Sequence, residues 1–223
     1  MLITFSGIVG SGKSTNAKRA YHRLKEMGYP VEYVRFRFVN LKSVLKPHSG
    51  RGAGKTGRQT PNKQNGMTSL RAHRPRKMTL VRCLGYLWRM LVFRLFVAIR
   101  LRGKIGICDR FFYDNFTHYA FTTTPEKVYL KLLKSLLPQP DLALMLVASA
   151  DKIIERRKQY DPHYLARMTK NYLKVLREFP NVTMVRTDEF EGLDATIDTH
   201  IREALKNFMG QRKAQPRDYA TVK

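Results

Sequence analysis

Short apolar runs alternate with amphipathic stretches along most of this 223-residue chain. The apolar runs predict strands, and these are Leu2–Phe5, Val31–Val39, Lys104–Cys108, Leu142–Val147 and Val182–Arg186. Apolar residues at helical spacing predict helices between and after them, and these are Lys13–Met27, Met78–Leu101, Lys127–Leu137, Asp151–Lys158, Pro162–Phe179 and Ala195–Met209. This alternation favours an α/β fold, a doubly wound and mostly parallel sheet with helices on both faces.

The stretch Met78–Leu101 is the most apolar of the predicted helices. A membrane span is one interpretation, but Arg89 and Arg94 lie near its middle. Each central arginine costs about 2.5–3.5 kcal/mol on insertion. The sequence therefore predicts a core helix and no transmembrane segment, with a helix lying on an anionic membrane surface as the alternative.

Length and composition indicate one large α/β domain over residues 1–210. Residues 46–77 are rich in Gly, Pro, Asn, Lys and Arg, which predicts a basic, flexible insertion, and residues 211–223 read as a basic tail. Two cysteines and no secretory signal favour a reducing compartment, and we expect a cytoplasmic protein.

The residues between the first predicted strand and the first predicted helix match the pattern G-x-x-x-x-G-K-[ST]. They are Gly7, Ile8, Val9, Gly10, Ser11, Gly12, Lys13, Ser14 and Thr15. Glycines allow successive backbone N–H groups to surround phosphate, Lys13 can reach the β- and γ-phosphates, and Ser14 can bind Mg²⁺. The sequence therefore predicts a phosphate-binding loop (P-loop) that takes ATP with magnesium.

The net charge of +25 is concentrated in one third of the chain. Residues 33–108 contain 18 lysines and arginines and no acidic residue. Such a stretch attracts anionic partners, and we expect residues 46–77 to contact a polyanion. Arg35 and Arg37 share one face of the second strand and are predicted to meet a substrate phosphate; an edge strand with a solvated face is the alternative.

Asp109 and Arg110 directly follow the predicted strand Lys104–Cys108. Ligands of open α/β sheets bind outside the carboxyl ends of the strands. Asp109 is therefore predicted to hold Mg²⁺ or orient the acceptor, and Arg110 to stabilise charge on the transferred phosphoryl group. Because Arg110 stands where a second carboxylate could activate water, the pair favours transfer to a bound acceptor over hydrolysis.

A second basic cluster, Glu155–Lys158, offers Arg156 and Arg157. We interpret it as a lid that brings an arginine to the γ-phosphate, with an exposed helical face as the alternative. The six histidines and two cysteines show no spacing typical of a metal site.

These motifs together resemble the thymidylate kinase family. The resemblance rests on the P-loop after Phe5-Ser6, on Asp109-Arg110-Phe111, on Pro140-Asp141-Leu142 and on Glu155-Arg156-Arg157, and covers most of the chain outside 46–77. It implies a kinase that uses Mg-ATP to phosphorylate dTMP or a related monophosphate. Lys13, Asp109, Arg110 and Arg156 or Arg157 would then be catalytic, Ser14 and Asp109 would serve magnesium, and Asn115 would lie near the base. It also implies a homodimer formed through helices that flank the sheet.

One position and one segment depart from the family pattern. Val9 stands where the family has an aspartate that contacts the acceptor sugar, and Arg35-Phe36-Arg37-Phe38 replaces an Arg-Glu-Pro-Gly segment. Losing a polar contact weakens discrimination strongly, so we expect dTMP to be a poor substrate. Two other readings stay open: a kinase for another anionic acceptor, such as a phosphorylated or sulfated sugar or glycan, and a P-loop module that binds nucleic acid.

Overall fold

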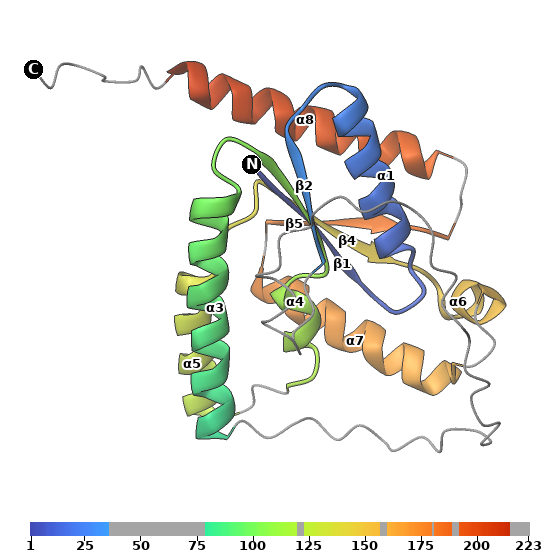
Figure 1. The fold of residues 1–223 in the computed structure, drawn as a ribbon. Helices are drawn as coiled ribbons and strands as arrows, with labels where there is room; N and C mark the ends of the chain where they lie inside the picture. The colour runs from blue at the N-terminus through green and yellow to red at the C-terminus, as the bar shows by residue number, and fades with distance from the viewer. Residues whose placement is uncertain (36–78, 120–122, 157–159, 180, 189–191, 215–223) are drawn as a thin grey trace, which may run out of the picture.

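Five parallel strands form the central sheet of the computed structural model (Figure 1). The structure describes residues 1–35, 79–119, 123–156, 160–179, 181–188 and 192–214. The strands are β1 (Leu2–Gly7), β2 (Val31–Arg35), β3 (Ile105–Asp109), β4 (Leu142–Val147) and β5 (Val182–Arg186). Their spatial order is β2-β3-β1-β4-β5, and every pairing is parallel. The α/β class with a parallel sheet is confirmed.

Helices cover both faces of this sheet (Figure 1). On one face lie α1 (Lys13–Glu26) and α8 (Leu193–Ala214). On the other lie α3 (Leu80–Arg100), α4 (Phe112–Phe116), α5 (Thr124–Leu136), α6 (Ala150–Arg156) and α7 (Pro162–Glu178). The strands connect through helices because consecutive parallel strands need a crossover.

The side chains of the central strands alternate between two apolar layers. In β4, Leu142, Leu144 and Leu146 pack toward α1 and α8, whereas Ala143 and Met145 pack toward the opposite layer. This alternation explains why β4 reads as a continuous apolar run, since a strand buried on both faces has no polar side. The register places Phe5 of β1 opposite Asp109 of β3, so both strands end at the same edge.

Most predicted elements are present, with shifted ends. α5 begins at Thr124, three residues before the predicted start, because Thr123 and Glu126 form a capping box and Pro125 occupies its first turn. The short helix α4 was not predicted at all. The insertion 46–77, strand residues 36–39 and the end of the tail lie outside the described residues.

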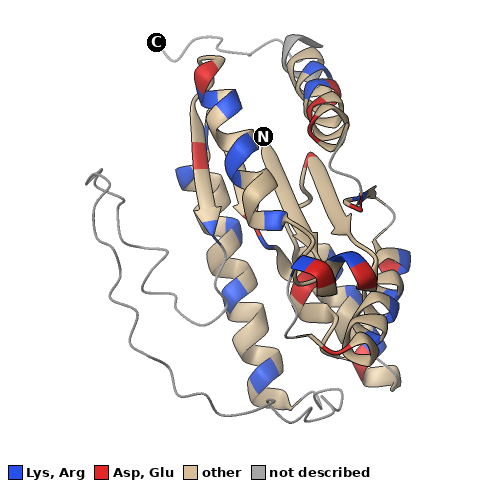
Figure 2. Ribbon diagram, turned by 90° about the vertical axis from the view of Figure 1, so that its right-hand side faces the viewer, with Lys and Arg blue, Asp and Glu red and all other residues tan. Residues whose placement is uncertain are grey.

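The long helix α3 is the helix predicted over Met78–Leu101. Within the part of the chain that the structure describes, no helix is long and apolar enough to cross a bilayer. α3 buries Tyr86, Met90 and Phe93 against the core. Its 21 residues carry arginines and no Asp or Glu, as the blue bands in Figure 2 show.

The core between the sheet and α5 gives a stability test at Leu133, which is fully buried. We expect Leu133→Ala to lower the free energy of unfolding by about 2–5 kcal/mol, because it removes packed methyl groups and leaves a cavity. Leu173→Ala on α7 is the matched control, since that leucine is 44% exposed, and we expect it to cost less than about 1 kcal/mol. Urea unfolding of both variants measures the difference, and equal costs would contradict this packing.

Candidate active site at the carboxyl edge of the sheet

The phosphate loop leaves the sheet directly from β1. Gly7, Gly10 and Gly12 all have positive φ angles, of 141°, 87° and 82°. At Gly7 no side chain could fit, because an added Cβ would lie 2.0 Å from the carbonyl oxygen of Leu146 on β4. The glycines of the motif therefore permit both the turn and its close contact with the neighbouring strand.

Within the loop, Ile8 is the shared hydrogen-bond acceptor. Its carbonyl accepts from Ser11 N–H at 3.2 Å, from Ser11 Oγ at 2.8 Å and from Lys13 Nζ at 2.6 Å. Lys13 therefore folds back over the loop and does not extend into solvent. Ser14 follows in the first turn of α1 and is half-buried.

At the end of β3, the carboxylate of Asp109 is completely buried. Tyr33 donates its hydroxyl to Asp109 Oδ2 at 3.0 Å, and Arg35 Nε lies 3.6 Å from the same oxygen. Burial and the neighbouring Asp109 raise the pKa of Tyr33, which keeps this donor protonated. The other oxygen, Oδ1, has no hydrogen-bond partner among the described residues and is the open acceptor here.

Arg110 follows with a backbone conformation that is rare for an arginine. Its φ of 79° makes it the one non-glycine residue with positive φ in the described part of the chain. The Arg110 N–H donates to the carbonyl of Phe5 on β1 at 2.9 Å, which holds this turn against the strand that leads into the phosphate loop. Such a conformation costs of order 1–3 kcal/mol, so the surrounding packing stabilises it.

A functional candidate that the sequence analysis missed is Asp114 on α4. Its Oδ1 accepts hydrogen bonds from the N–H of Gly7 at 3.1 Å and from the hydroxyl of Tyr172 on α7 at 2.8 Å. Burial raises the pKa of Asp114, while the positive charges of Lys13 and Arg110 oppose that rise. A carboxylate among the four aromatic residues of 111–116 was the sequence signal that could have revealed it.

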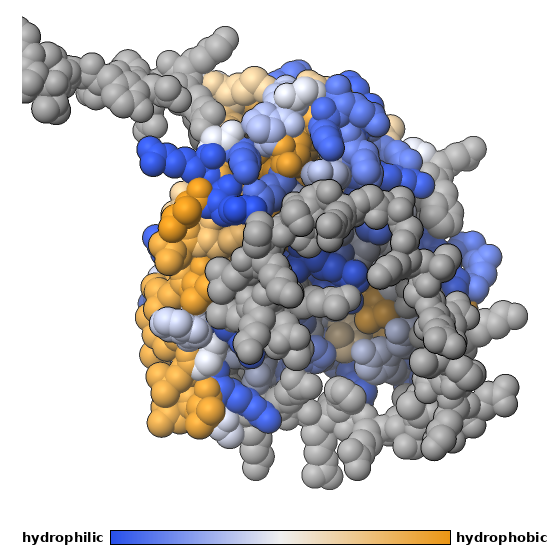
Figure 3. Space-filling view, viewed as in Figure 1, coloured by the Kyte–Doolittle hydropathy of each residue, from blue (hydrophilic) through white to orange (hydrophobic). Residues whose placement is uncertain are grey.

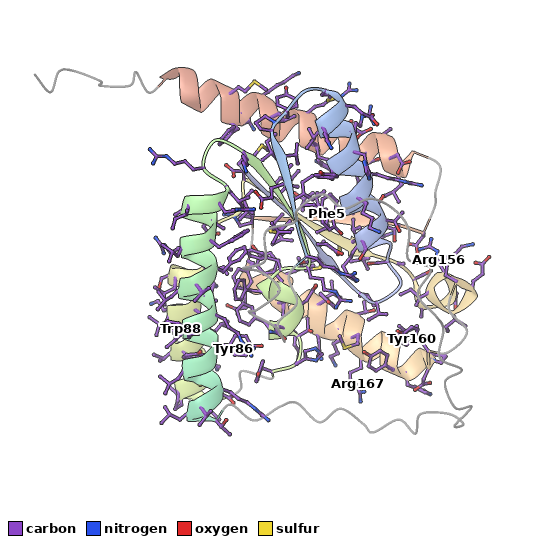
Figure 4. All side chains as sticks on the ribbon, in the orientation of Figure 1. Phe5, Tyr86, Trp88, Arg156, Tyr160 and Arg167 are labelled. Atoms are coloured by element: carbon purple, nitrogen blue, oxygen red, sulfur yellow. The ribbon has the colours of Figure 1, made fainter. Side chains whose placement is uncertain are left out.

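The helix α6 contacts the phosphate loop at Gly10. Arg156 donates to the carbonyl oxygens of Thr187 at 2.7 Å and of Gly10 at 3.5 Å. Figure 4 shows Arg156 on α6, beside the loop that leads into α1. The predicted lid arginine is thus held on backbone carbonyls next to the loop.

The structure brings most of the predicted site residues to one edge of the sheet. Gly7–Thr15, Arg35, Asp109, Arg110 and Arg156 lie at this edge, and Asn115 is half-buried on α4 beside Asp114. Arg37 and Arg157 lie outside the described residues.

Comparison with known proteins identifies the relatives of this chain. No protein-family model matches it. A thymidylate kinase of Neorickettsia sennetsu is 25% identical over 203 residues, covering 83% of this chain and 86% of that protein. Probable thymidylate kinases of Methanosphaera stadtmanae and Sulfurisphaera tokodaii are 24% and 23% identical, covering 94% and 86% of this chain and 99% and 90% of the relatives.

This chain is a distant relative of the thymidylate kinases. The resemblance noted from the motifs is confirmed, and so is the P-loop kinase fold, because the alignments cover nearly all of the sheet and its helices. In this thymidylate kinase relative, the phosphate loop is bordered by Asp114 on one side and by Arg156 on the other.

The close approach of Gly7 to β4 predicts a large effect of a single methyl group. We expect Gly7→Ala to lower the free energy of unfolding by at least about 3 kcal/mol, because its Cβ meets a backbone carbonyl. Gly28→Ala is the control: Gly28 also has positive φ, but a Cβ there meets nothing within 4 Å, so we expect a cost of about 1–2 kcal/mol. Denaturant unfolding compares the two, and similar losses would contradict the steric argument.

Proposed function

We propose that this protein is a phosphotransferase that moves the γ-phosphoryl group of Mg-ATP to a monophosphate acceptor, with residues 1–210 as its kinase domain. The observation that carries the proposal is the juxtaposition of the P-loop with Asp109 and Arg110. β1 and β3 are neighbours, and Arg110 N–H bonds to Phe5 only two residues before Gly7. The names of the relatives, thymidylate kinases, support a nucleotide as the acceptor.

The donor half of the site consists of loop amides, Lys13 and the start of α1. Amides at a helix N-terminus favour phosphate, and Lys13 adds a positive charge that can move from the Ile8 carbonyl to the β- and γ-phosphates. The residues present also fit Mg²⁺, since the Ser14 hydroxyl lies in the first turn of α1 and one buried carboxylate oxygen of Asp109 has no hydrogen-bond partner among the described residues. Bound Mg²⁺ would neutralise charge on the phosphates.

The acceptor half consists of Arg35, Arg110 and Asn115. Arg35 is half-exposed beside Asp109 at the exit of β2, where it can bind the acceptor phosphate. Arg110 is exposed between the strands and α4, where it can stabilise charge on the phosphoryl group in transfer. Val9 leaves the loop without a polar side chain at the position expected to contact the acceptor sugar, which favours a non-dTMP acceptor.

We expect Mg-ATP turnover that depends on an acceptor. ADP release would be measured with dTMP, with the other nucleoside monophosphates, with phosphorylated sugars and with no acceptor. A weak response to dTMP is expected, because Val9 cannot hydrogen-bond to the acceptor sugar. Lys13→Ala should reduce the stimulated rate by about 100-fold or more, since Lys13 stabilises the transferred charge.

Lys18→Ala is the matched control for Lys13→Ala, because Lys18 lies on the exposed side of α1. Its rate should equal that of the wild type. Efficient turnover of dTMP would overturn the expectation about Val9, and stimulation only by a phosphorylated sugar would establish the second candidate acceptor. No stimulation by any acceptor would contradict the kinase proposal.

We also propose that the protein forms a homodimer through α3. Seven apolar residues on this helix are 49–81% exposed, and they are Leu80, Val81, Leu84, Trp88, Leu91, Leu95 and Ile99. Their spacing places them on one face, opposite the buried Tyr86, Met90 and Phe93. Figure 3 shows this apolar stripe on the side of the molecule formed by α3, and Figure 4 shows Trp88 on the outer side of the helix.

The exposed stripe fits a second copy of the same chain. A helix of 21 residues is about 30 Å long, and a two-fold packing of two such faces buries both stripes at once. The arginines of α3 lie at the sides of the stripe and would stay in water at the rim of the interface. Exposed patches of this size mark interaction sites on soluble proteins.

Charge placed in the stripe should therefore separate the subunits. We expect a dimeric wild type, and Trp88→Glu or Leu95→Glu should give monomers at micromolar concentration, because each buries a carboxylate without a partner. Leu173→Glu, an exposed apolar position on α7, should stay dimeric. Light scattering after size exclusion measures the mass. A monomeric wild type that floats with phosphatidylserine vesicles would instead assign the stripe to a membrane surface.

A further inference from the structure

The side chain of Asp114 is buried where a carboxylate is costly. The residue is 8% exposed, and Phe111, Phe112 and Phe116 around it are at most 1% exposed. A buried carboxylate is tolerated only where hydrogen bonds and positive charges compensate it. Asp114 has both, and each partner belongs to the candidate active site or to α7.

One oxygen of this carboxylate joins the phosphate loop to α7. Oδ1 accepts from Gly7 N–H, the first amide of the loop, and from the hydroxyl of Tyr172. Burial and the neighbouring Asp114 raise the pKa of Tyr172 well above its ordinary value, so this phenol remains a donor. Packing against β4 thus holds the start of the loop. Asp114 on α4 also holds it and is itself hydrogen-bonded to Tyr172 on α7.

The other oxygen, Oδ2, is buried and has no hydrogen-bond partner among the described residues. The charged groups that act on the carboxylate are Lys13 from α1 and Arg110 from the end of β3. Asp114 is therefore within electrostatic reach of both cations that are expected to bind the transferred phosphoryl group. Its negative charge can hold both of them in place without touching the phosphates.

We propose that Asp114 is a positioning residue for phosphoryl transfer: it fixes the first amide of the phosphate loop and orients Lys13 and Arg110, and Tyr172 on α7 orients it in turn. This inference rests on the proposed kinase activity. Since Arg156 of α6 also donates to Gly10, the α6–α7 region reaches the loop at Gly10 directly and at Gly7 through Asp114. A shift of α7 would then reach the phosphates through Asp114.

Asp114→Asn tests the charge while it preserves the shape and one acceptor oxygen. We expect kcat to fall about 10- to 100-fold, because a small misplacement of reacting groups costs that much. The thermal midpoint should stay equal or rise, because a buried charge has been removed. A merely structural role predicts the opposite pattern, a lower midpoint with unchanged kcat of the folded protein, and that result would overturn the inference.

The pH profile of kcat gives a second readout that a structural role would not move. If the ionised carboxylate is required, activity falls as pH drops through its raised pKa. Tyr172→Phe removes a hydrogen bond to the ionised form, so it should raise that pKa further and move the acid limb of the profile to higher pH. Tyr164→Phe on the same helix is the control and should leave the limb in place. An unmoved limb in Tyr172→Phe would contradict the role of Tyr172.

Hydrogen exchange tests the link to the loop without any turnover. Asp114→Leu fills the same apolar surroundings but removes the acceptor, so the peptide that contains Gly7 should exchange about tenfold faster than in the wild type. Unchanged exchange would overturn the inference even if no acceptor stimulated the wild type. A wild type without turnover combined with faster exchange in the variant would reject the kinase proposal and retain the Asp114 link.

Discussion

The position of Gly7 governs the geometry of the site. β1 is the middle strand of the sheet, and its pairing with β3 and β4 fixes it on both sides. Gly7 is the last residue of β1, is paired with Leu146 and has no room for a side chain. At the end of the strand, the Gly7 N–H donates a hydrogen bond to Asp114 on α4. The start of the loop is therefore fixed by β3, β4 and α4.

Two buried carboxylates have different surroundings at this edge. Asp109 is fixed by Tyr33 and Arg35 from β2, and its second oxygen is buried without a hydrogen-bond partner in the described part of the chain. Asp114 is fixed by the loop amide and Tyr172, and its negative charge lies near Lys13 and Arg110. Because Asp109 lies beside Arg35 and Asp114 lies near Lys13 and Arg110, the cations that would bind phosphate are held in place before any phosphate binds. Electrostatic catalysis needs groups that are placed in advance in this way.

Sequence patterns predicted the parts of the molecule that depend on local chemistry. The strands Leu142–Val147 and Val182–Arg186 have the predicted bounds. For Leu142–Val147 the reason is that a strand covered on both faces leaves an apolar run. The phosphate loop was predicted because glycine spacing reports backbone geometry directly. The helix α4 was missed because five residues are too few to show a helical period. Asp114 on this helix was missed as well, because its partners Gly7 and Tyr172 lie 107 and 58 residues away in the sequence. Only the tertiary fold brings these residues together.

The two halves of the proposed site depend on different parts of the chain, so relatives that are 23–25% identical could share one fold even where their acceptors differed. The donor half uses backbone amides, a lysine and glycines that the sheet positions, so most surrounding side chains can change without altering it. The acceptor half uses side chains at the exit of β2, at position 9 and on α4. A single change there, such as valine for a polar residue at position 9, removes a hydrogen bond and leaves the loop backbone intact. The proposed site therefore assigns acceptor specificity to residues that contribute little to the phosphate loop itself.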